Sequence, residues 1–228
     1  GMRRLGIPQY QHDQLLDAVS LCQPSLLMSH LASADEPKRP DSAQQRNVFE
    51  LVRSSLGALC PPSSLANTAG ILLGDAYHYD LVRPGIGLYG GSPDPFDSKE
   101  LEAVVTWQAQ VIELQQVRRG EPVGYGGSYV APCDLSLATI GLGYADGYLR
   151  ALSDKGEVLV EGQRCPIVGR VSMDLITVDV SSLRSVKEGM WVEIMGPGIS
   201  VDTVAEKANT IGYECLTRLG ARMERVIV

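Results

Sequence analysis

The sequence predicts an α/β segment followed by an all-β domain, with the division near residue 95. In residues 1–95, short apolar runs alternate with stretches of helical periodicity, as in a parallel α/β arrangement. In residues 96–228, many short segments alternate apolar and polar side chains between turn signals, which favours a barrel or a sandwich. The stretch 91–98 contains two prolines and is predicted to be the linker.

The N-terminal elements follow in order along the chain. Residues 10–22 are expected to form an amphipathic helix, 25–31 a buried strand and 42–58 a second helix. Residues 64–73 are apolar, and residues 80–89 are strand-like and end in a glycine-rich turn. About three parallel strands result, whereas a closed (β/α) barrel needs eight. The helix residues expected to face inward are Leu15, Leu16, Val19, Cys22, Val48, Leu51, Val52, Ser55 and Leu56.

The C-terminal domain is predicted to consist mainly of short strands. Residues 201–219 return to helical periodicity, with Asp202 as the expected N-cap. Val204, Ala205 and Ala208 are expected to face inward on that helix. The segments expected to be strands are 104–117, 137–144, 156–162, 165–171, 174–180 and 190–196.

The composition is that of a globular protein and excludes several classes of partner. The chain has 228 residues, is 44% hydrophobic and carries a net charge of −7, which argues against nucleic acid or an anionic membrane. The five cysteines form no CxxC pair, and the three histidines show no metal-ligand spacing. We therefore expect a cytoplasmic protein with reduced thiols, no metal, no membrane segment and no signal peptide.

Five segments rich in glycine, tyrosine or hydroxyl residues stand out as carriers of chemistry. Taken alone, the first two are compatible with phosphate sites at strand ends or with tight turns, and the residues leave both interpretations open. The segments are Ser63–Gly70 (SSLANTAG), Val82–Gly90 (VRPGIGLYG), Val123–Tyr129 (VGYGGSY), Gly143–Tyr148 (GYADGY) and Gly169–Asp174 (GRVSMD).

In this order, together with the GMRRLG start at 1–6, the segments resemble the C-terminal part of alanine racemases. These are fold-type III enzymes that depend on pyridoxal phosphate (PLP) and interconvert L- and D-alanine. The resemblance implies an incomplete TIM-type (β/α) barrel, of which this chain holds the last three or so strands, followed by a C-terminal β-barrel-like domain. It also implies a homodimer in which the β domain of one subunit completes the site of the other.

The resemblance assigns the cofactor site to five residues. Arg83 matches the arginine that hydrogen-bonds the pyridine nitrogen of PLP, where a guanidinium that keeps its proton weakens the electron sink. Thr68, Gly85 and Ile86 match phosphate ligands, and so does Tyr213. The alternatives are a surface ion pair for Arg83 and a core aromatic for Tyr213. In some members of the family, a histidine occupies the position of Ser64 and contacts this arginine.

The substrate side of the site is assigned to three further residues. Tyr125 matches the tyrosine that serves as the base on one face of the α-carbon. Met173 matches a residue whose backbone N–H binds the substrate carboxylate, and Tyr144 matches a tyrosine at the narrow inner end of the route to the site. The alternative for Tyr125 is an ordinary strand aromatic in a glycine-rich bulge.

The family's second base and covalent anchor is a lysine in a segment similar to VVKANAYGHG, and no segment of this chain resembles it. The five lysines, none at an apolar strand end, are Lys38, Lys99, Lys155, Lys187 and Lys207. We expect either a fragment, a natural truncation or a chain that pairs with a separate N-terminal half, and in each case no turnover by this polypeptide alone. A non-catalytic β-domain assembly or binding module is the alternative function.

Overall fold

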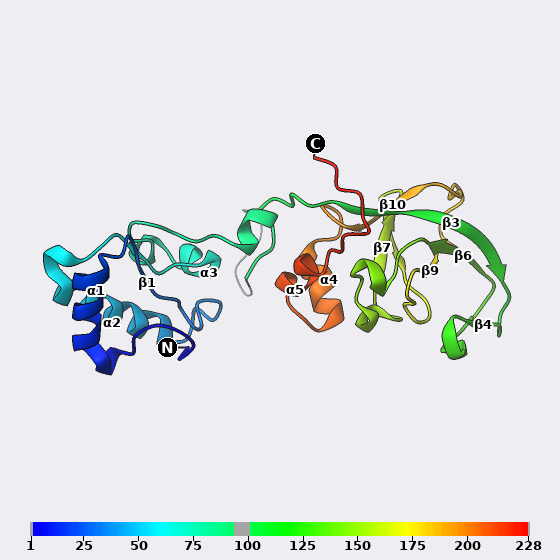
Figure 1. Cartoon of the computed structure of the whole chain (residues 1–228). Coiled ribbons are helices and arrows are strands. Elements are labelled where there is room, and N and C mark those ends of the chain that lie inside the picture. The colour runs from blue at the N-terminus through cyan, green and yellow to red at the C-terminus, as the bar shows by residue number, and fades with distance from the viewer. Residues whose placement is uncertain (1, 94–100, 228) are drawn as a thin grey trace. The chain divides into compact units, whose positions relative to one another are not determined.

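The computed structural model describes residues 2–93 and 101–227, which form two compact units. One unit consists of residues 2–88 with 92 and 93, and the other of residues 89–91 and 101–227 (Figure 1). Part of the predicted linker, residues 94–98, lies outside the described residues, and the boundary near residue 95 stays a prediction. Among the described residues, no helix is both long enough and apolar enough to cross a bilayer.

The N-terminal unit pairs short parallel strands with longer helices. β1 and β2 pair in parallel, with Leu27 opposite Ser63, and a single parallel bridge from Asn67 to Arg83 adds a third segment. A core of Leu31, Ala34, Phe49, Leu65 and Ala69 fills the unit. The bounds are α1 His12–Cys22, β1 Leu27–Met28, α2 Asp41–Leu56, β2 Ser63–Ser64 and α3 Thr68–Leu72.

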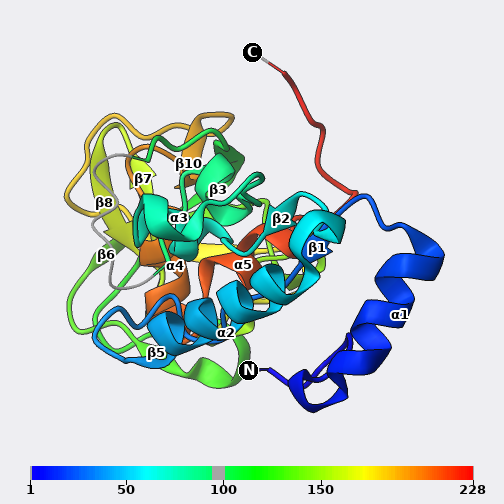
Figure 2. The ribbon, with the colours of Figure 1, turned by 90° about the vertical axis from the view of Figure 1, so that its left-hand side faces the viewer.

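Both predicted N-terminal helices are confirmed, although their buried faces differ from the expected ones. Val19 is buried on α1, whereas Cys22 is exposed, and Figure 2 shows α1 set apart from α2. On α2, Leu51 is 66% exposed and Ser55 is also exposed, so both were assigned to the wrong face. The edge-to-face contact of Phe49 with Tyr79, with ring centroids 5.1 Å apart, shows which side of α2 faces the core.

The predicted strand over 80–89 is wrong. Arg83 donates its backbone N–H to Ala66 at 2.9 Å and forms one bridge, but Pro84 has no N–H with which to continue a ladder. Residues Ile86–Tyr89 then coil into a short 3-10 helix. The third parallel segment is therefore one bridge long.

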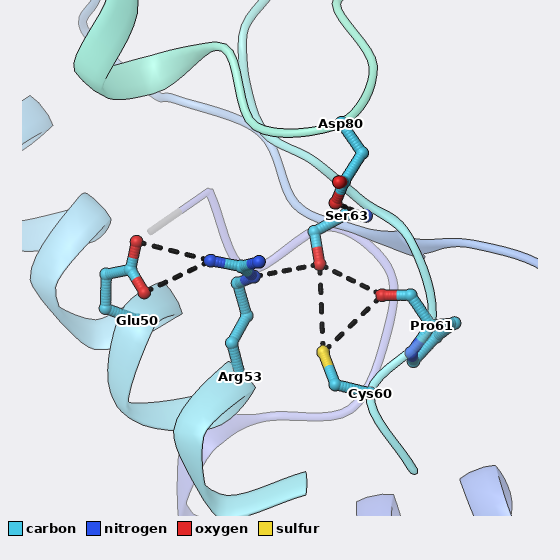
Figure 3. A network of polar contacts seen from close by, with 6 residues as sticks. All are labelled: Glu50, Arg53, Cys60, Pro61, Ser63 and Asp80. Carbon is cyan, nitrogen blue, oxygen red and sulfur yellow. Dashed lines mark hydrogen bonds and ion pairs between the residues drawn. The ribbon is translucent and has the colours of Figure 1, made fainter. Parts of the chain in front are cut away.

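A polar network joins α2 to the start of β2 (Figure 3). The hydroxyl of Ser63 accepts a hydrogen bond from Nε of Arg53 at 3.0 Å and donates one to the Pro61 carbonyl at 3.2 Å. The backbone N–H of Ser63 donates to Asp80 at 2.8 Å, and Glu50 pairs with Arg53 at 3.3 Å. Because Ser63 is fully buried, these bonds satisfy groups that could not reach water.

The C-terminal unit is built on one six-stranded sheet with the order β8-β7-β10-β3-β6-β9, in which the pairs between neighbours are antiparallel. Its outer strands also meet, because Val168 donates to the Thr177 carbonyl at 2.9 Å and Ile167 bridges Val178. The sheet is thus nearly closed, as the barrel prediction implies. The bounds are β3 Trp107–Val117, β4 Pro122–Val123, β5 Tyr129–Val130, β6 Leu135–Ile140, β7 Glu157–Val160, β8 Gln163–Pro166, β9 Ile176–Asp179, β10 Trp191–Met195, α4 Val201–Ala208 and α5 Gly212–Thr217.

Five of the six predicted C-terminal strands are confirmed, the predicted strand 165–171 overlaps β8 only at residues 165 and 166, and the predicted last helix is two helices. Asn209 adopts a left-handed conformation (φ 56°) that ends α4 before α5 begins. The N-cap is Ser200, whose hydroxyl accepts from the Thr203 N–H at 3.1 Å, and not Asp202. Val204, Ala205 and Ala208 are buried as expected.

The sheet interior should dominate the stability of this unit. Ile194 on β10 is fully buried, whereas Ile112 on β3 is 51% exposed. Ile194→Ala is expected to lower the free energy of unfolding by about 2–5 kcal/mol, since it removes buried methylenes and leaves a cavity. Ile112→Ala is the matched control and should cost below about 1 kcal/mol. Urea denaturation followed by circular dichroism measures both, and equal losses would contradict the assigned core.

Candidate functional site

Arg83 lies in a set of neutral acceptors supplied by two neighbouring segments, at the end of β1 and at β2. Its Nη1 donates to the Ser64 hydroxyl at 2.5 Å, and its Nη2 donates to the Ser29 carbonyl at 2.8 Å and to the Leu65 carbonyl at 3.3 Å. Within the described residues Arg83 has no carboxylate partner and its Nε makes no hydrogen bond. The half-buried cation is therefore held in place, and its Nε–H and one Nη1–H are left for acceptors.

β2 positions this arginine because successive side chains of a strand point to opposite faces. The Ser63 side chain bonds Arg53 of α2, and the next side chain, Ser64, bonds Arg83 and donates to the Leu81 carbonyl at 2.6 Å. Among the described residues Arg83 has no acidic partner, so there it is not the surface ion-pair residue of the alternative interpretation.

His30 contacts the same guanidinium and was missed by the sequence analysis. Its Nδ1 lies 3.3 Å from Nη2 of Arg83. Burial, the charge of Arg83 and the charge of Arg4 lower the pKa of His30 below its ordinary value. Burial likewise lowers the pKa of Arg83, which still stays protonated at neutral pH. A neutral histidine beside a protonated arginine keeps the local charge at one positive unit.

The predicted phosphate ligands meet directly beside Arg83. The hydroxyl of Thr68 accepts hydrogen bonds from the backbone N–H of Gly85 at 2.9 Å and of Gly87 at 3.4 Å. A methyl group built on Gly85 would meet no atom within 4 Å, so the Cα side of this glycine is open. Ile86 is buried between the two glycines. Thr68, Gly85 and Ile86 thus lie together, and their role as phosphate ligands stays a prediction.

Tyr125 projects from a glycine turn in the C-terminal unit and is 72% exposed. Gly124 and Gly126 both have positive φ, 74° and 71°, which a residue with a side chain rarely adopts. Gly169 and Arg170 pack against this turn: a methyl group built on Gly124 would lie 3.4 Å from the Arg170 backbone nitrogen. The turn and the 169–174 segment line a surface cavity of about 470 Å³, whose lining is Gly124, Tyr125, Gly126, Thr139, Arg170, Ser172, Leu175 and Thr177.

Tyr144 and Met173 are brought together by backbone contact. The Tyr144 N–H donates to the Ser172 carbonyl at 3.0 Å, and the Ala145 N–H donates to the Met173 carbonyl at 2.9 Å. A methyl group built on Gly143 would lie 2.2 Å from the Met173 carbonyl oxygen, so this approach requires glycine. Both side chains remain partly in solvent, Tyr144 at 43% and Met173 at 54% exposed.

The candidate residues thus form one group in each unit. Arg83, Thr68, Gly85 and Ile86 belong to the N-terminal unit, and Tyr125, Tyr144 and Met173 to the C-terminal unit. Tyr213 lies on α5 of the C-terminal unit, 42% exposed, and is not part of the core as the alternative interpretation had it. The roles assigned to all eight residues stay predictions.

The sequence analysis also missed Arg170, which was quoted inside a segment but given no role. An exposed arginine gives no sequence signal of its own. Its Nη1 would lie 3.4 Å from a methyl group on Gly126, which places the guanidinium at the Tyr125 turn. Only the fold of the 169–174 segment brings these positions together.

Comparison with known proteins agrees with this arrangement. Residues 1–93 match the family described as alanine racemase, N-terminal domain, and residues 104–227 match alanine racemase, C-terminal domain. The chain belongs to the alanine racemase family. An alanine racemase of Rhodospirillum rubrum is 43% identical over 230 residues, and one of Methylobacterium nodulans is 47% identical over 229. Each alignment covers 99% of this chain and 61% of the racemase it matches.

Solved alanine racemase structures show the same fold. The enzyme of Bartonella henselae, with covalently bound pyridoxal phosphate, superimposes with a TM-score of 0.91 at 38% identity, over 100% of this chain and 64% of that one. The enzyme of Streptomyces coelicolor superimposes with a TM-score of 0.92 at 34% identity, over 99% of this chain and 63% of that one. The chain therefore has the alanine racemase fold, a TIM-like barrel portion with a β domain, over the part that is aligned.

The contact of Gly143 with Met173 can be tested by a single methyl group. Gly143→Ala is expected to lower the free energy of unfolding by about 1–3 kcal/mol or more, because the added carbon collides with backbone. Gly141→Ala is the matched control: its added carbon would meet the Ile112 side chain at an ordinary 3.4 Å. That variant should change stability by less than about 0.5 kcal/mol. Denaturant titration measures the free energy of unfolding of both variants. An unchanged stability of Gly143→Ala would refute the close approach.

Proposed function

We propose that this chain acts in the PLP-dependent interconversion of L- and D-alanine. The observation that carries the proposal is the setting of Arg83, a half-buried guanidinium with neutral hydrogen-bond acceptors and no carboxylate partner among the described residues. A structural arginine is normally paired with an acid when it leaves water. An arginine held by neutral groups, with Nε available, suits an uncharged ring nitrogen as acceptor.

The residues present fit the cofactor at both of its ends. Nε of Arg83 can donate to the pyridine nitrogen, and the Thr68 hydroxyl with the Gly85 and Ile86 N–H groups is proposed to hold the phosphate. When bound, PLP supplies the electron sink that acidifies the proton on the α-carbon of the amino acid. Arg83 keeps its own proton and thereby limits that sink, which favours return of the proton over other reactions. Tyr213 is proposed to reach the phosphate as well.

The C-terminal unit would supply the groups that act on the substrate. The Tyr125 phenol oxygen is proposed to remove or return the proton on one face of the α-carbon. The Met173 N–H is proposed to bind the carboxylate, and Tyr144 to restrict the site to small amino acids. These three side chains are all partly or largely exposed, and such a face supports a homodimer in which the β domain of one copy serves the site of the other.

The lysine of the family is proposed to come from outside these residues. Lys38 is exposed in a loop, Lys155 and Lys187 are exposed in or beside turns, and Lys207 on α4 pairs with Glu157 at 3.4 Å. Lys99 lies outside the described residues. The chain spans 61% of the length of the curated relatives named above. Because none of the described lysines stands at an apolar strand end, we propose that this polypeptide alone does not racemise alanine. A separate N-terminal half is the proposed partner, and a cytoplasmic location stays a prediction.

Cofactor binding can be tested without turnover. Thr68→Val removes the hydroxyl that contacts Gly85 and Gly87 and is expected to weaken binding of PLP by roughly tenfold to a hundredfold, since hydrogen bonds to charged groups are worth about 1.5–3 kcal/mol. Thr68→Ser keeps the hydroxyl and should bind within a few-fold of the parent. Equilibrium ultrafiltration with PLP measures both. Thr203→Val, whose hydroxyl pairs with Ser200 at the start of α4, is the control in the other unit.

Turnover is tested by supplying the missing base. The 228-residue chain is assayed with PLP, alone and mixed with a polypeptide that carries the lysine and first barrel strands of a relative. Racemisation of both alanine enantiomers is expected only in the mixture. Tyr125→Phe should then lower the rate by roughly 10²–10⁴-fold, the usual contribution of a general base. Tyr129→Phe, four positions along the chain, is the matched control.

The alternative function makes the opposite prediction in this assay. A non-catalytic β-domain assembly or binding module would neither retain PLP nor racemise alanine in the mixture. Tyr125→Phe would then have no effect on any property of the protein. A mixture that binds PLP but leaves alanine unchanged would also refute alanine as the substrate.

A further inference from the structure

Three segments of the C-terminal unit converge on the guanidinium of Arg222. Its Nη1 lies 2.8 Å from Oδ1 of Asp174, and its Nε lies 3.4 Å from Oδ1 of Asp146. Asp174 directly follows Met173 in the chain, and Asp146 comes two residues after Tyr144. One arginine of the C-terminal tail is therefore linked to both segments that carry the proposed substrate contacts.

We propose that Arg222 is a positioning residue that fixes Tyr144 and Met173 relative to each other. The inference rests on the proposed function for its consequence in catalysis, whereas the positioning itself is a property of this unit. Arg222 touches neither side chain in any contact above, so its action passes through the two aspartates. The fork of a guanidinium can reach two carboxylates at once, which a lysine ammonium on a flexible stem does less well.

Asp146 connects Arg222 to the turn that carries Tyr144. The residue is buried, with 8% of its surface exposed, and its Oδ2 accepts the Gly143 N–H at 2.9 Å. A buried carboxylate is unfavourable unless it is paired and hydrogen-bonded. Arg222 provides the opposite charge, and Gly143 provides the hydrogen bond. The carboxylate that shapes the turn is thus neutralised from the tail.

The tail itself is anchored where Arg222 emerges from it. A methyl group built on Gly147, at φ 106°, would lie 2.1 Å from the Arg218 carbonyl oxygen, and the Gly220 N–H donates to the Asp146 carbonyl at 3.3 Å. The backbone around 218–220 is therefore packed against the end of the Tyr144 turn. Arg222 extends from this fixed base and reaches Asp174 on the third segment.

The expected effect is local rather than global. The Arg222 side chain is 54% exposed and that of Asp174 is 52% exposed, and ion pairs at such positions add little to overall stability. What they can change is how often the two segments separate. The Tyr144 and Ala145 amides report that event directly, because their hydrogen bonds to Ser172 and Met173 are the contacts between the segments.

The test measures hydrogen exchange at these two amides in the full chain without cofactor. Arg222→Gln is expected to speed exchange of the Tyr144 and Ala145 amides by about threefold to tenfold, while amides of the β3 and β6 ladder keep their rates. Arg225→Gln is the matched control: it removes the same charge from the same tail, and within residues 2–93 and 101–227 the Arg225 side chain contacts no carboxylate and donates to the Leu219 carbonyl at 3.3 Å. If the Tyr144 and Ala145 amides exchange at the same rates in Arg222→Gln as in Arg225→Gln, the proposal is overturned.

Two further variants keep the test decisive if Arg222→Gln fails to fold. Arg222→Lys retains the charge but not the fork, and it should exchange faster at Tyr144 and Ala145 than Arg225→Lys does. Asp174→Asn should also speed exchange at these two amides, and its effect should not add to that of Arg222→Lys in the double variant. Additive effects in the double variant would show that the two residues act separately, which contradicts a link.

A kinetic measurement connects the link to the proposed racemase. In the active mixture, Arg222→Gln should raise the KM for alanine several-fold with a smaller change in kcat, because the Met173 N–H and Tyr144 are proposed to hold the substrate. A change confined to kcat would overturn this part. A parent mixture without racemase activity would refute the proposed function, yet the exchange experiment would still decide whether Arg222 fixes the two segments.

Discussion

The C-terminal unit depends on one seam, where the two outer strands of its sheet meet. β8 and β9 are the ends of the sheet order, and they are joined by residues 167–175. Because Ile167 and Val168 pair with β9, the connection starts at the line where β8 and β9 meet and has to cross it. It then lies against the Tyr125 turn at Gly169 and against the Tyr144 turn at Met173. Closing the sheet therefore assembles the proposed substrate face as a direct consequence.

The seam connection is itself held by polar groups from the preceding turn. The Asp154 carboxylate accepts the Gly169 N–H at 2.6 Å, and the Ser153 hydroxyl accepts the Val171 N–H at 3.0 Å. Val171 is buried in the main core, so the backbone there cannot bond to water. The hydrogen bonds to Asp154 and Ser153 thus fix the backbone of residues 169–171. The same connection then continues to Met173, whose side chain is partly exposed.

Alternating patterns predicted the strands of the C-terminal unit well because each has one buried face, as on β3 and β6. The failures occurred where two local choices were equally good. Ser200 and Asp202 are both strong N-caps, and the structure uses Ser200, whose hydroxyl accepts the Thr203 N–H. The family segments gave the candidate residues, but no spacing rule could bring Arg222 to Asp146 and Asp174, 76 and 48 positions away in the chain.

The two groups of candidate residues are each ordered by their own unit, and this separates family membership from turnover. Ser64 and the carbonyls of Ser29 and Leu65 fix Arg83 without any contribution from the β domain. The seam and the aspartates fix Tyr144 and Met173 without the α/β unit. Each group therefore keeps its geometry through contacts within its own unit. Under the proposed function, these contacts do not by themselves supply the second base that proton exchange on both faces of an α-carbon requires.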